Sequence, residues 1–306
     1  MAMRIRIATR GSRLSLIQTG IVMNMIRRIE PSVQFEIKIT KTTGDVIQDK
    51  PLYAIGVKGI FEKEVNMALL RNEADIAVHS LKDLPSEINP GLVIAGFSSR
   101  DSPYDVLVVR DEYVDDLMAL PSGARIGTSS IRRRAFLFSV RSDVVYDVIR
   151  GNVDTRISKL IKGEYDAVVL AEAGLVRLIK DLSDFHVRYT RIPLDVLPPA
   201  PGQGIIAVIA RERDTDIVDV LRRASDPKAR IEALAERAFL RAIGGGCHVP
   251  VGGIAMYSNG RLGFIAGIAD VNGNRRRIIK LVGSPDNPEE LGVNAAHELL
   301  EQWNET

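Results

Sequence analysis

Residues 4–29, "RIRIATRGSRLSLIQTGIVMNMIRRI", decide the fold class, because one complete unit of strand, loop and helix lies within them. Isoleucines that alternate with other residues over 4–9 predict a β-strand. From 15 to 29 the apolar residues recur at helical spacing, with Leu16, Val22 and Ile26 on one stripe. A strand that passes through a short loop into an amphipathic helix is typical of α/β proteins.

The same rhythm continues to about residue 210, with further strands expected at 34–40 and 74–80 and a helix near 59–72 between them. Two segments rich in turn residues, "FSSRDSPY" at 97–104 and "DVLPPAPGQG" at 195–204, interrupt it. We therefore expect two α/β lobes joined by two crossings of the chain. Lobe 1 would comprise residues 1–98 and 200–221, lobe 2 residues 99–199, and a ligand cleft would lie between them.

The composition changes after about residue 221, which predicts a third domain over 222–306. Asp226 is suited to cap a helix that begins at Pro227 and ends at the glycines 244–246. Two Asn-Gly pairs between apolar runs then predict a meander of three antiparallel strands. An amphipathic segment at 287–303 closes the chain as a helix, so the third domain is expected to be a small α+β unit.

The overall composition excludes several classes of protein. Lys plus Arg is 41 against 39 for Asp plus Glu, and aromatic residues make up 5% of the 306 residues. This balance gives no reason to expect a nucleic-acid partner. Neither a secretory signal nor an apolar run long enough to span a membrane is present, so we expect a cytoplasmic protein with no membrane partner.

Arginines are concentrated where predicted strands end, at the positions that border a cleft in α/β lobes. Guanidinium groups there are suited to carboxylates or phosphates. The set therefore predicts a polyanion site across two lobes, and the alternative is that individual members are solvated or form local salt bridges. Its members are Arg10, Arg132, Arg133, Arg150, Arg156 and Arg177.

The segment "HSLKDLPS" at 79–86 follows a buried strand and places Lys82 beside Asp83. A carboxylate at this position could move a proton or stabilise a developing cation, or it could form a loop salt bridge. Loop residues around Asp45, Lys58 and Phe61 are of the kind that act as lids. Neither a P-loop nor a dinucleotide-binding glycine motif is present.

The only cysteine, Cys247, lies in "IGGGCHVPVGG" at 243–253. A buried structural thiol is one interpretation, and a metal site with His248 is a weak one, because no further ligand lies at suitable spacing. The flanking glycines favour a third interpretation, an accessible thiol. A thiol that serves as an attachment point would need no base beside it. No metal site is expected.

Seven motifs, in order and at the family's approximate spacing, resemble porphobilinogen deaminase, also called hydroxymethylbilane synthase. They are "ATRGSRLSLIQT", "HSLKDLP", "GTSSIRRRA", "RGNVDTRISKL", "EYDAVVLAEAGLVRL", "APGQG" and "GGGCHVPVGG". The resemblance covers nearly the whole chain. It implies three domains, two of them similar to the lobes of periplasmic binding proteins with mixed sheets, and a smaller α+β domain with a three-stranded antiparallel sheet.

The resemblance also implies the activity. Four porphobilinogen molecules would be condensed with loss of ammonia into hydroxymethylbilane, on a dipyrromethane cofactor held by a thioether to Cys247, and water would release the product. Asp83 matches the catalytic carboxylate, which would assist proton transfer and stabilise an azafulvene cation. The family suggests a monomer.

Further residues match binding positions of the family. Those matched to the cofactor, besides Cys247, are Lys82, Asp83, Thr128, Ser129, Ser130, Arg132, Arg133, Arg150 and Gly151. Those matched to the substrate are Arg10, Ser12, Arg150, Arg156, Arg177, Phe61 and Gln203, the last two near a lid and an interdomain hinge. The main alternative class is a non-catalytic anion-binding module, which would explain the arginines but neither the thiol nor "HSLKDLP".

Overall fold

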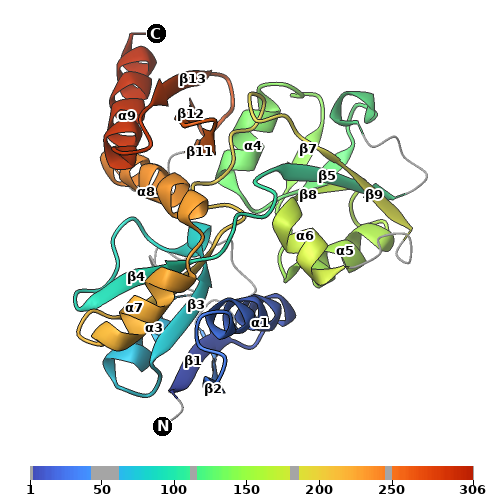
Figure 1. Cartoon of the computed structure of the whole chain (residues 1–306). Coiled ribbons are helices and arrows are strands. Elements are labelled where there is room, and N and C mark those ends of the chain that lie inside the picture. Colours follow the sequence, from blue (N-terminus) through green and yellow to red (C-terminus); the bar gives the residue numbers. More distant parts are fainter. Residues whose placement is uncertain (1–2, 43–61, 111–115, 180–185, 245–249, 306) are drawn as a thin grey trace.

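A computed structural model describes residues 3–42, 62–110, 116–179, 186–244 and 250–305. It divides into two α/β lobes and a smaller α+β unit, which Figure 1 shows as three separate groups of elements around a central crossing point. The predicted fold class is confirmed by two five-stranded mixed sheets and one three-stranded antiparallel sheet. No helix in the described part of the chain is long and apolar enough to span a membrane.

Lobe 1 contains the first five-stranded sheet, in the order β2-β1-β3-β10-β4. Strands β1 and β2 and strands β1 and β3 are parallel, whereas β10 is antiparallel to both of its neighbours. The strands are β1 (Arg4–Arg10), β2 (Gln34–Thr40), β3 (Ile76–Ser80), β4 (Leu92–Phe97) and β10 (Ile206–Arg211). Since β10 follows residues 195–204, the chain has returned to the first sheet.

Helices cover both faces of this sheet because side chains alternate along each buried strand. Ile5 and Ile7 of β1 pack in the cluster that contains residues of α1 and α7, whereas Ala8 packs in the cluster that contains α3. The helices are α1 (Arg13–Arg27), α3 (Lys63–Leu70) and α7 (Thr215–Ala224), and a short 3-10 turn covers Leu81–Asp83.

Lobe 2 repeats the topology of lobe 1, with the order β7-β6-β8-β5-β9 and one antiparallel strand, β5, in the fourth position. Its strands are β5 (Asp105–Arg110), β6 (Arg125–Gly127), β7 (Val145–Asp147), β8 (Ala167–Ala171) and β9 (Val187–Arg191). Its helices are α4 (Ile131–Phe138), α5 (Val153–Ile161) and α6 (Glu172–Leu178), with a 3-10 turn at Leu117–Ala119. In both sheets the antiparallel strand is the one that the chain enters directly after a crossing.

The C-terminal unit consists of α8 (Pro227–Ala242), β11 (Val251–Ser258), β12 (Arg261–Ala269), β13 (Arg276–Gly283) and α9 (Pro288–Asn304). The predicted cap is confirmed, because the Asp226 carboxylate accepts a hydrogen bond of 2.8 Å from the Ala229 amide. The first Asn-Gly turn has positive φ at both Asn259 and Gly260, which is the conformation that a two-residue hairpin of this type requires.

The C-terminal unit is attached to both crossings. Arg100, in the first crossing, forms salt bridges of 2.9 and 2.6 Å with Glu232 and Glu236 of α8. In the second crossing, the carbonyl of Pro199 accepts a hydrogen bond of 2.8 Å from the amide of Gly253. The two crossings therefore form a junction to which all three units contribute.

Candidate active site

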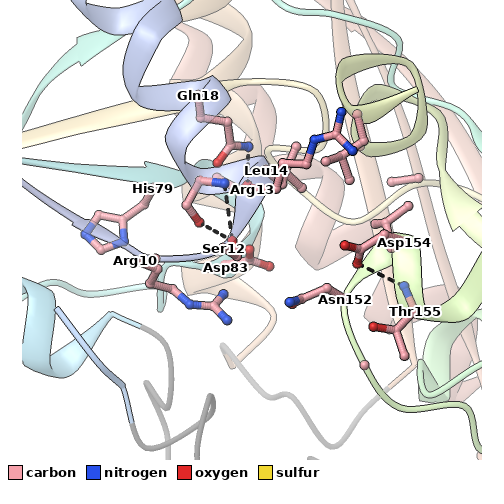
Figure 2. A pocket seen from close by; sticks show the side chains of 18 of the residues that line it. Arg10, Ser12, Arg13, Leu14, Gln18, His79, Asp83, Asn152, Asp154 and Thr155 are labelled. Carbon is pink, nitrogen blue, oxygen red and sulfur yellow. Dashed lines mark hydrogen bonds between the residues drawn. The ribbon is translucent and has the colours of Figure 1, made fainter. Parts of the chain in front are cut away.

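A cleft with a volume of about 760 Å³ lies between the two lobes. Lobe 1 contributes the carboxyl ends of β1, β2 and β3 and the start of α1, and lobe 2 contributes the end of β8 and residues 150–156. Figure 2 shows Arg10 and Asp83 on one side of the space and Asn152, Asp154 and Thr155 on the other. The cleft is thus formed by loops that follow strands in both sheets, where α/β proteins bind ligands.

The described wall of the cleft carries an excess of positive charge. Seven Lys or Arg side chains line it, against three carboxylates. The cations are Arg10, Arg13, Lys41, Lys82, Arg133, Arg150 and Arg156, and the carboxylates are Glu62, Asp83 and Asp154. Such a surface favours a ligand with several negative charges.

Two short connections carry the predicted site residues of the lobe 1 wall. Arg10 is the last residue of β1, and Ser12 caps α1 by accepting a hydrogen bond of 3.2 Å from the Ser15 amide. Lys82 and Asp83 lie in the 3-10 turn after β3, where Asp83 is exposed to the cleft. Burial lowers the pKa of Lys82 to about 8, although the charge of Asp83 opposes this change. Near neutral pH, Lys82 is a cation beside an accessible carboxylate.

The lobe 2 wall brings three guanidinium groups close together, those of Arg133, Arg150 and Arg156. Burial, together with the charges of Arg133 and Arg150, lowers the pKa of Arg156 to about 10. Arg156 donates a hydrogen bond of 2.9 Å from Nε to the carbonyl of Gly151, and the positive φ of Gly151 permits that turn. A bound carboxylate would relieve the repulsion among these like charges.

Arg132 and Arg133 are adjacent in sequence but do not occupy equivalent positions. Arg133 lines the cleft, whereas Arg132 is outside its wall and donates hydrogen bonds to the carbonyl of Pro198 and to Asp105, both at 2.7 Å. Successive residues of a helix point in directions about 100° apart, which accounts for the difference.

Five other predicted site residues also lie outside the cleft wall. Thr128, Ser129 and Ser130 form the turn before α4, in which Ser130 accepts a hydrogen bond from the Arg133 amide and Ser129 donates to the carbonyl of Ile149. Gln203 lies in the second crossing, whereas Arg177 belongs to α6 and reaches both crossings with its side chain. The guanidinium of Arg177 contacts Asp101 at 2.7 Å and the carbonyl of Gly204 at 2.8 Å. Gln203 is almost fully buried.

Two of the predicted residues, Phe61 and Cys247, fall outside the described residues, as do Asp45, Lys58 and His248. The elements before and after Cys247 are described. The chain enters this segment from α8 and leaves it into β11, and β11 is bound to the second crossing through Gly253.

Sequence reasoning missed two buried residues beside the cleft. His79 is 6% exposed and lines the cleft wall. Burial lowers its pKa to about 3, so the ring is neutral, and Nε2 lies 3.0 Å from Oδ1 of Asn66. Asp105 is fully buried and contacts both Arg132 and Arg133. A carboxylate directly before the apolar run 106–109 was the available signal for Asp105.

Among the residues described, no group of three or more His, Cys, Asp or Glu side chains is arranged to hold a metal ion. The donors that converge on the cleft are guanidinium, ammonium and hydroxyl groups. This set of donors fits a ligand that carries several carboxylates, and Asp83 is placed to exchange a proton with such a ligand.

Two family models match the chain. The model described as "Porphobilinogen deaminase, dipyromethane cofactor binding domain" matches residues 5–219, and that described as "Porphobilinogen deaminase, C-terminal domain" matches residues 230–301. A curated protein of Pyrobaculum arsenaticum, "Probable porphobilinogen deaminase", is 55% identical over 97% of each chain. The "Porphobilinogen deaminase" of Francisella tularensis is 42% identical over 97% of this chain and 96% of its own.

Among solved structures, the periplasmic VFT2 domain of BvgS from Bordetella pertussis is 17% identical, with a TM-score of 0.44. The similarity covers 73% of this chain and 86% of that one.

Proposed function

The chain belongs to the porphobilinogen deaminase family, and from that premise we propose which of its residues carry out the reaction. The enzyme is a transferase of tetrapyrrole biosynthesis, hydroxymethylbilane synthase, and it contains the dipyrromethane cofactor-binding domain. We infer that the inter-lobe cleft is the active site, that Asp83 is its catalytic carboxylate, and that Cys247 holds the cofactor. The observation that carries the proposal is the exposed Asp83 in a cleft with seven cationic side chains.

The residues of the cleft fit a dipyrromethane group. Each of its two pyrrole rings carries an acetate and a propionate, so the group brings four carboxylates. Arg133 and Arg150 of lobe 2 and Lys82 of lobe 1 would hold these carboxylates, and Cys247 would hold the group by a thioether. When bound, the group supplies a pyrrole with an unsubstituted α-carbon that accepts the first substrate.

Asp83 would act on the substrate from lobe 1. As the C–N bond of the aminomethyl group breaks, a proton is needed on the departing ammonia, and positive charge develops on the methylene and its pyrrole ring. A carboxylate within reach of both sites can assist the proton transfer and stabilise the cation. After the α-carbon of the terminal pyrrole attacks the methylene carbon and the new C–C bond forms, the same carboxylate can accept the proton that this α-carbon loses.

Arginines would bind the growing chain, mainly from lobe 2. Every porphobilinogen that adds to the chain brings two more carboxylates, so the demand for cationic partners grows with each of the four condensations. Arg150 and Arg156 line the cleft close to Arg133, and Arg10 faces them from lobe 1. Ser12 adds a hydroxyl on the same side as Arg10.

The remaining assignments concern residues away from the wall and the organisation of the protein. We propose that Arg132, Arg177, Gln203, Thr128, Ser129 and Ser130 act by shaping the cleft or its hinge, and that Phe61 contributes to substrate binding. We propose three domains: residues 1–98 together with 200–221, residues 99–199, and residues 222–306. We also propose that the protein is a cytoplasmic monomer whose substrate is porphobilinogen and that it has no nucleic-acid or membrane partner.

Intact-protein mass spectrometry tests the proposal. Purified wild-type protein should exceed the mass of its sequence by two linked pyrrole units, and Cys247→Ser should lack the increment. Asp83→Asn is the control, because we expect it to keep the increment while it loses turnover. An unmodified wild-type protein with full activity would contradict the assignment of Cys247.

A further inference from the structure

One buried carboxylate, that of Asp105, connects several of the groups on which the proposed site depends. Asp105 is the first residue of β5, directly after the first crossing, and is fully buried. Its Oδ2 accepts a hydrogen bond of 2.7 Å from Nη2 of Arg132. Its Oδ1 accepts one of 2.9 Å from Nε of Arg133 and lies 2.7 Å from Nη2 of the same residue.

Gln203 extends this network from lobe 2 to lobe 1. Its Nε2 donates to Oδ1 of Asp105 at 3.2 Å and to the carbonyl of Pro103 at 2.7 Å. Its Oε1 accepts a hydrogen bond of 3.2 Å from Nζ of Lys82, the residue before Asp83. A continuous path of polar contacts therefore leads from the arginines of α4, through the second crossing, to the turn that carries Asp83.

The orientation of both arginines is fixed from more than one direction. Besides Asp105, Arg132 donates to the carbonyl of Pro198, and Arg133 donates from Nη1 to the carbonyl of Val169 at 2.8 Å. Burial without a negative partner would be costly for these guanidinium groups. Asp105 supplies that charge, and by its position it determines where the cleft-lining Arg133 lies.

We propose that Asp105 is a positioning residue of the condensation reaction, holding Arg133 in the cleft wall and, through Gln203 and Lys82, the turn that carries Asp83. This inference rests on the proposed function, in which Asp83 is the catalytic carboxylate. Catalytic groups must be held to within a fraction of an ångström, which residues behind the cleft wall achieve through such contacts.

The first test compares Asp105→Asn with a matched control, Asp75→Asn. Asp75 also bonds two arginines, Arg6 at 2.7 Å and Arg211 at 3.1 Å, but is outside the cleft wall. Both variants should unfold at lower temperature than wild type. Only Asp105→Asn should lose kcat, by roughly 10- to 100-fold at a temperature where both are folded. Equal kcat in the two variants would overturn the proposal.

Gln203→Met provides a second variant that leaves the arginine–carboxylate bonds in place. It should lower kcat because it breaks the link to Lys82. When Asp105→Asn is added to Gln203→Met, kcat should fall by a smaller factor than when Asp105→Asn is made in wild type, because the effects of residues on one contact path are not additive. If the loss of kcat in the double variant equalled the product of the losses in the two single variants, Asp105 would not act through Gln203. If Asp105→Asn does not fold, wild-type kcat in folded Gln203→Met would overturn the proposal.

The protonation of Lys82 gives a readout that does not depend on turnover. The charged groups that face Lys82 are Asp83, Asp105, Arg132 and Arg133. Asp105 raises the pKa of Lys82, so its removal should move the midpoint of Lys82 acetylation to lower pH, as followed by peptide mass spectrometry. Asp75→Asn should not move it. An unchanged midpoint in Asp105→Asn would contradict the contact path.

Failure of this inference is distinguishable from failure of the proposed function. The two-pyrrole mass increment is measured first in every variant, and kcat is expressed per molecule that carries it. If wild type carries the increment and Asp83→Asn is inactive, but Asp105→Asn behaves like its control, only the role of Asp105 is lost.

Discussion

The two lobes have the same strand order, yet they present different chemistry to the cleft between them. On the lobe 1 wall, cations lie near carboxylates, and Lys82 is adjacent to the exposed Asp83. On the lobe 2 wall, three guanidinium groups lie close together, so that burial and then the charges of Arg133 and Arg150 lower the pKa of Arg156. The shared topology thus fixes where the loops meet, while the loop sequences decide which charges each wall carries, and on this difference rests our proposal that proton transfer is handled from lobe 1 and that most of the carboxylate binding comes from lobe 2.

Loss of Asp83 should produce the largest effect, because we propose that this carboxylate acts on the reacting atoms. Asp83→Asn keeps the size of the side chain but cannot exchange a proton, so we expect kcat to fall by roughly 10²- to 10⁴-fold with little change in KM. Steady-state assays of product formation measure both constants.

Asp154→Asn is the matched control for that experiment, since Asp154 is an exposed carboxylate on the opposite wall of the same cleft. It should retain nearly full kcat. If the two variants lost kcat equally, the cleft would depend on its total charge and not on a division of roles between the lobes.

Loss of one lobe 2 guanidinium should produce a smaller effect of a different kind. Arg156→Leu removes a partner for substrate carboxylates, and we expect KM for porphobilinogen to rise by roughly 10- to 100-fold, the range of a charge-assisted hydrogen bond. Lys162→Leu, at the exposed end of the same helix, should leave KM unchanged. A fall in kcat alone for Arg156→Leu would contradict a binding role.

The neutral histidine of the lobe 1 wall gives the smallest expected effect, on stability. The pKa of His79 is about 3 in the folded protein, below the value of 6.5 in the unfolded chain. The unfolded state therefore gains a proton first, and His79 makes the fold less stable as pH falls below 6.5. At pH 5 the free energy of unfolding is lowered by about 2 kcal/mol for this reason.

Between pH 7 and pH 5, the free energy of unfolding of His79→Gln should therefore fall by about 2 kcal/mol less than that of wild type, as measured by urea unfolding. His297→Gln, which changes an exposed histidine of α9, should follow wild type. If His79→Gln also followed wild type, the ring would be charged in the folded protein, and lobe 1 would present one more cation to the cleft.

Sequence patterns anticipated the secondary structure well where the pattern is local. The expected strand at 34–40 is β2 to the residue, and the capped helix at Asp226 and the Asn-Gly hairpin both form as predicted. The first helix begins at Arg13, two residues before the expected start, because Ser12 caps it. These features depend on neighbouring residues, which a single sequence records.

Local sequence patterns could not predict in which direction a side chain points or which residues far apart in the chain contact each other. The run Arg132–Arg133 does not reveal that only Arg133 reaches the cleft, since that depends on how α4 packs. Nor does the sequence pair Asp105 with Gln203, which lies 98 residues away and approaches it only because both crossings pass through one junction. The motif resemblance indicated which segments to expect at the site, but the contacts behind the cleft wall required the folded chain.

The most direct test of the division between the lobes is the mass of the enzyme after brief mixing with porphobilinogen. Wild type should show a ladder of species that carry successive additional pyrrole units. Asp83→Asn should remain at the two-pyrrole cofactor, because its chemistry fails at the first condensation, whereas Arg156→Leu should begin the ladder and accumulate at an intermediate length. The same arrested species in both variants would contradict the account.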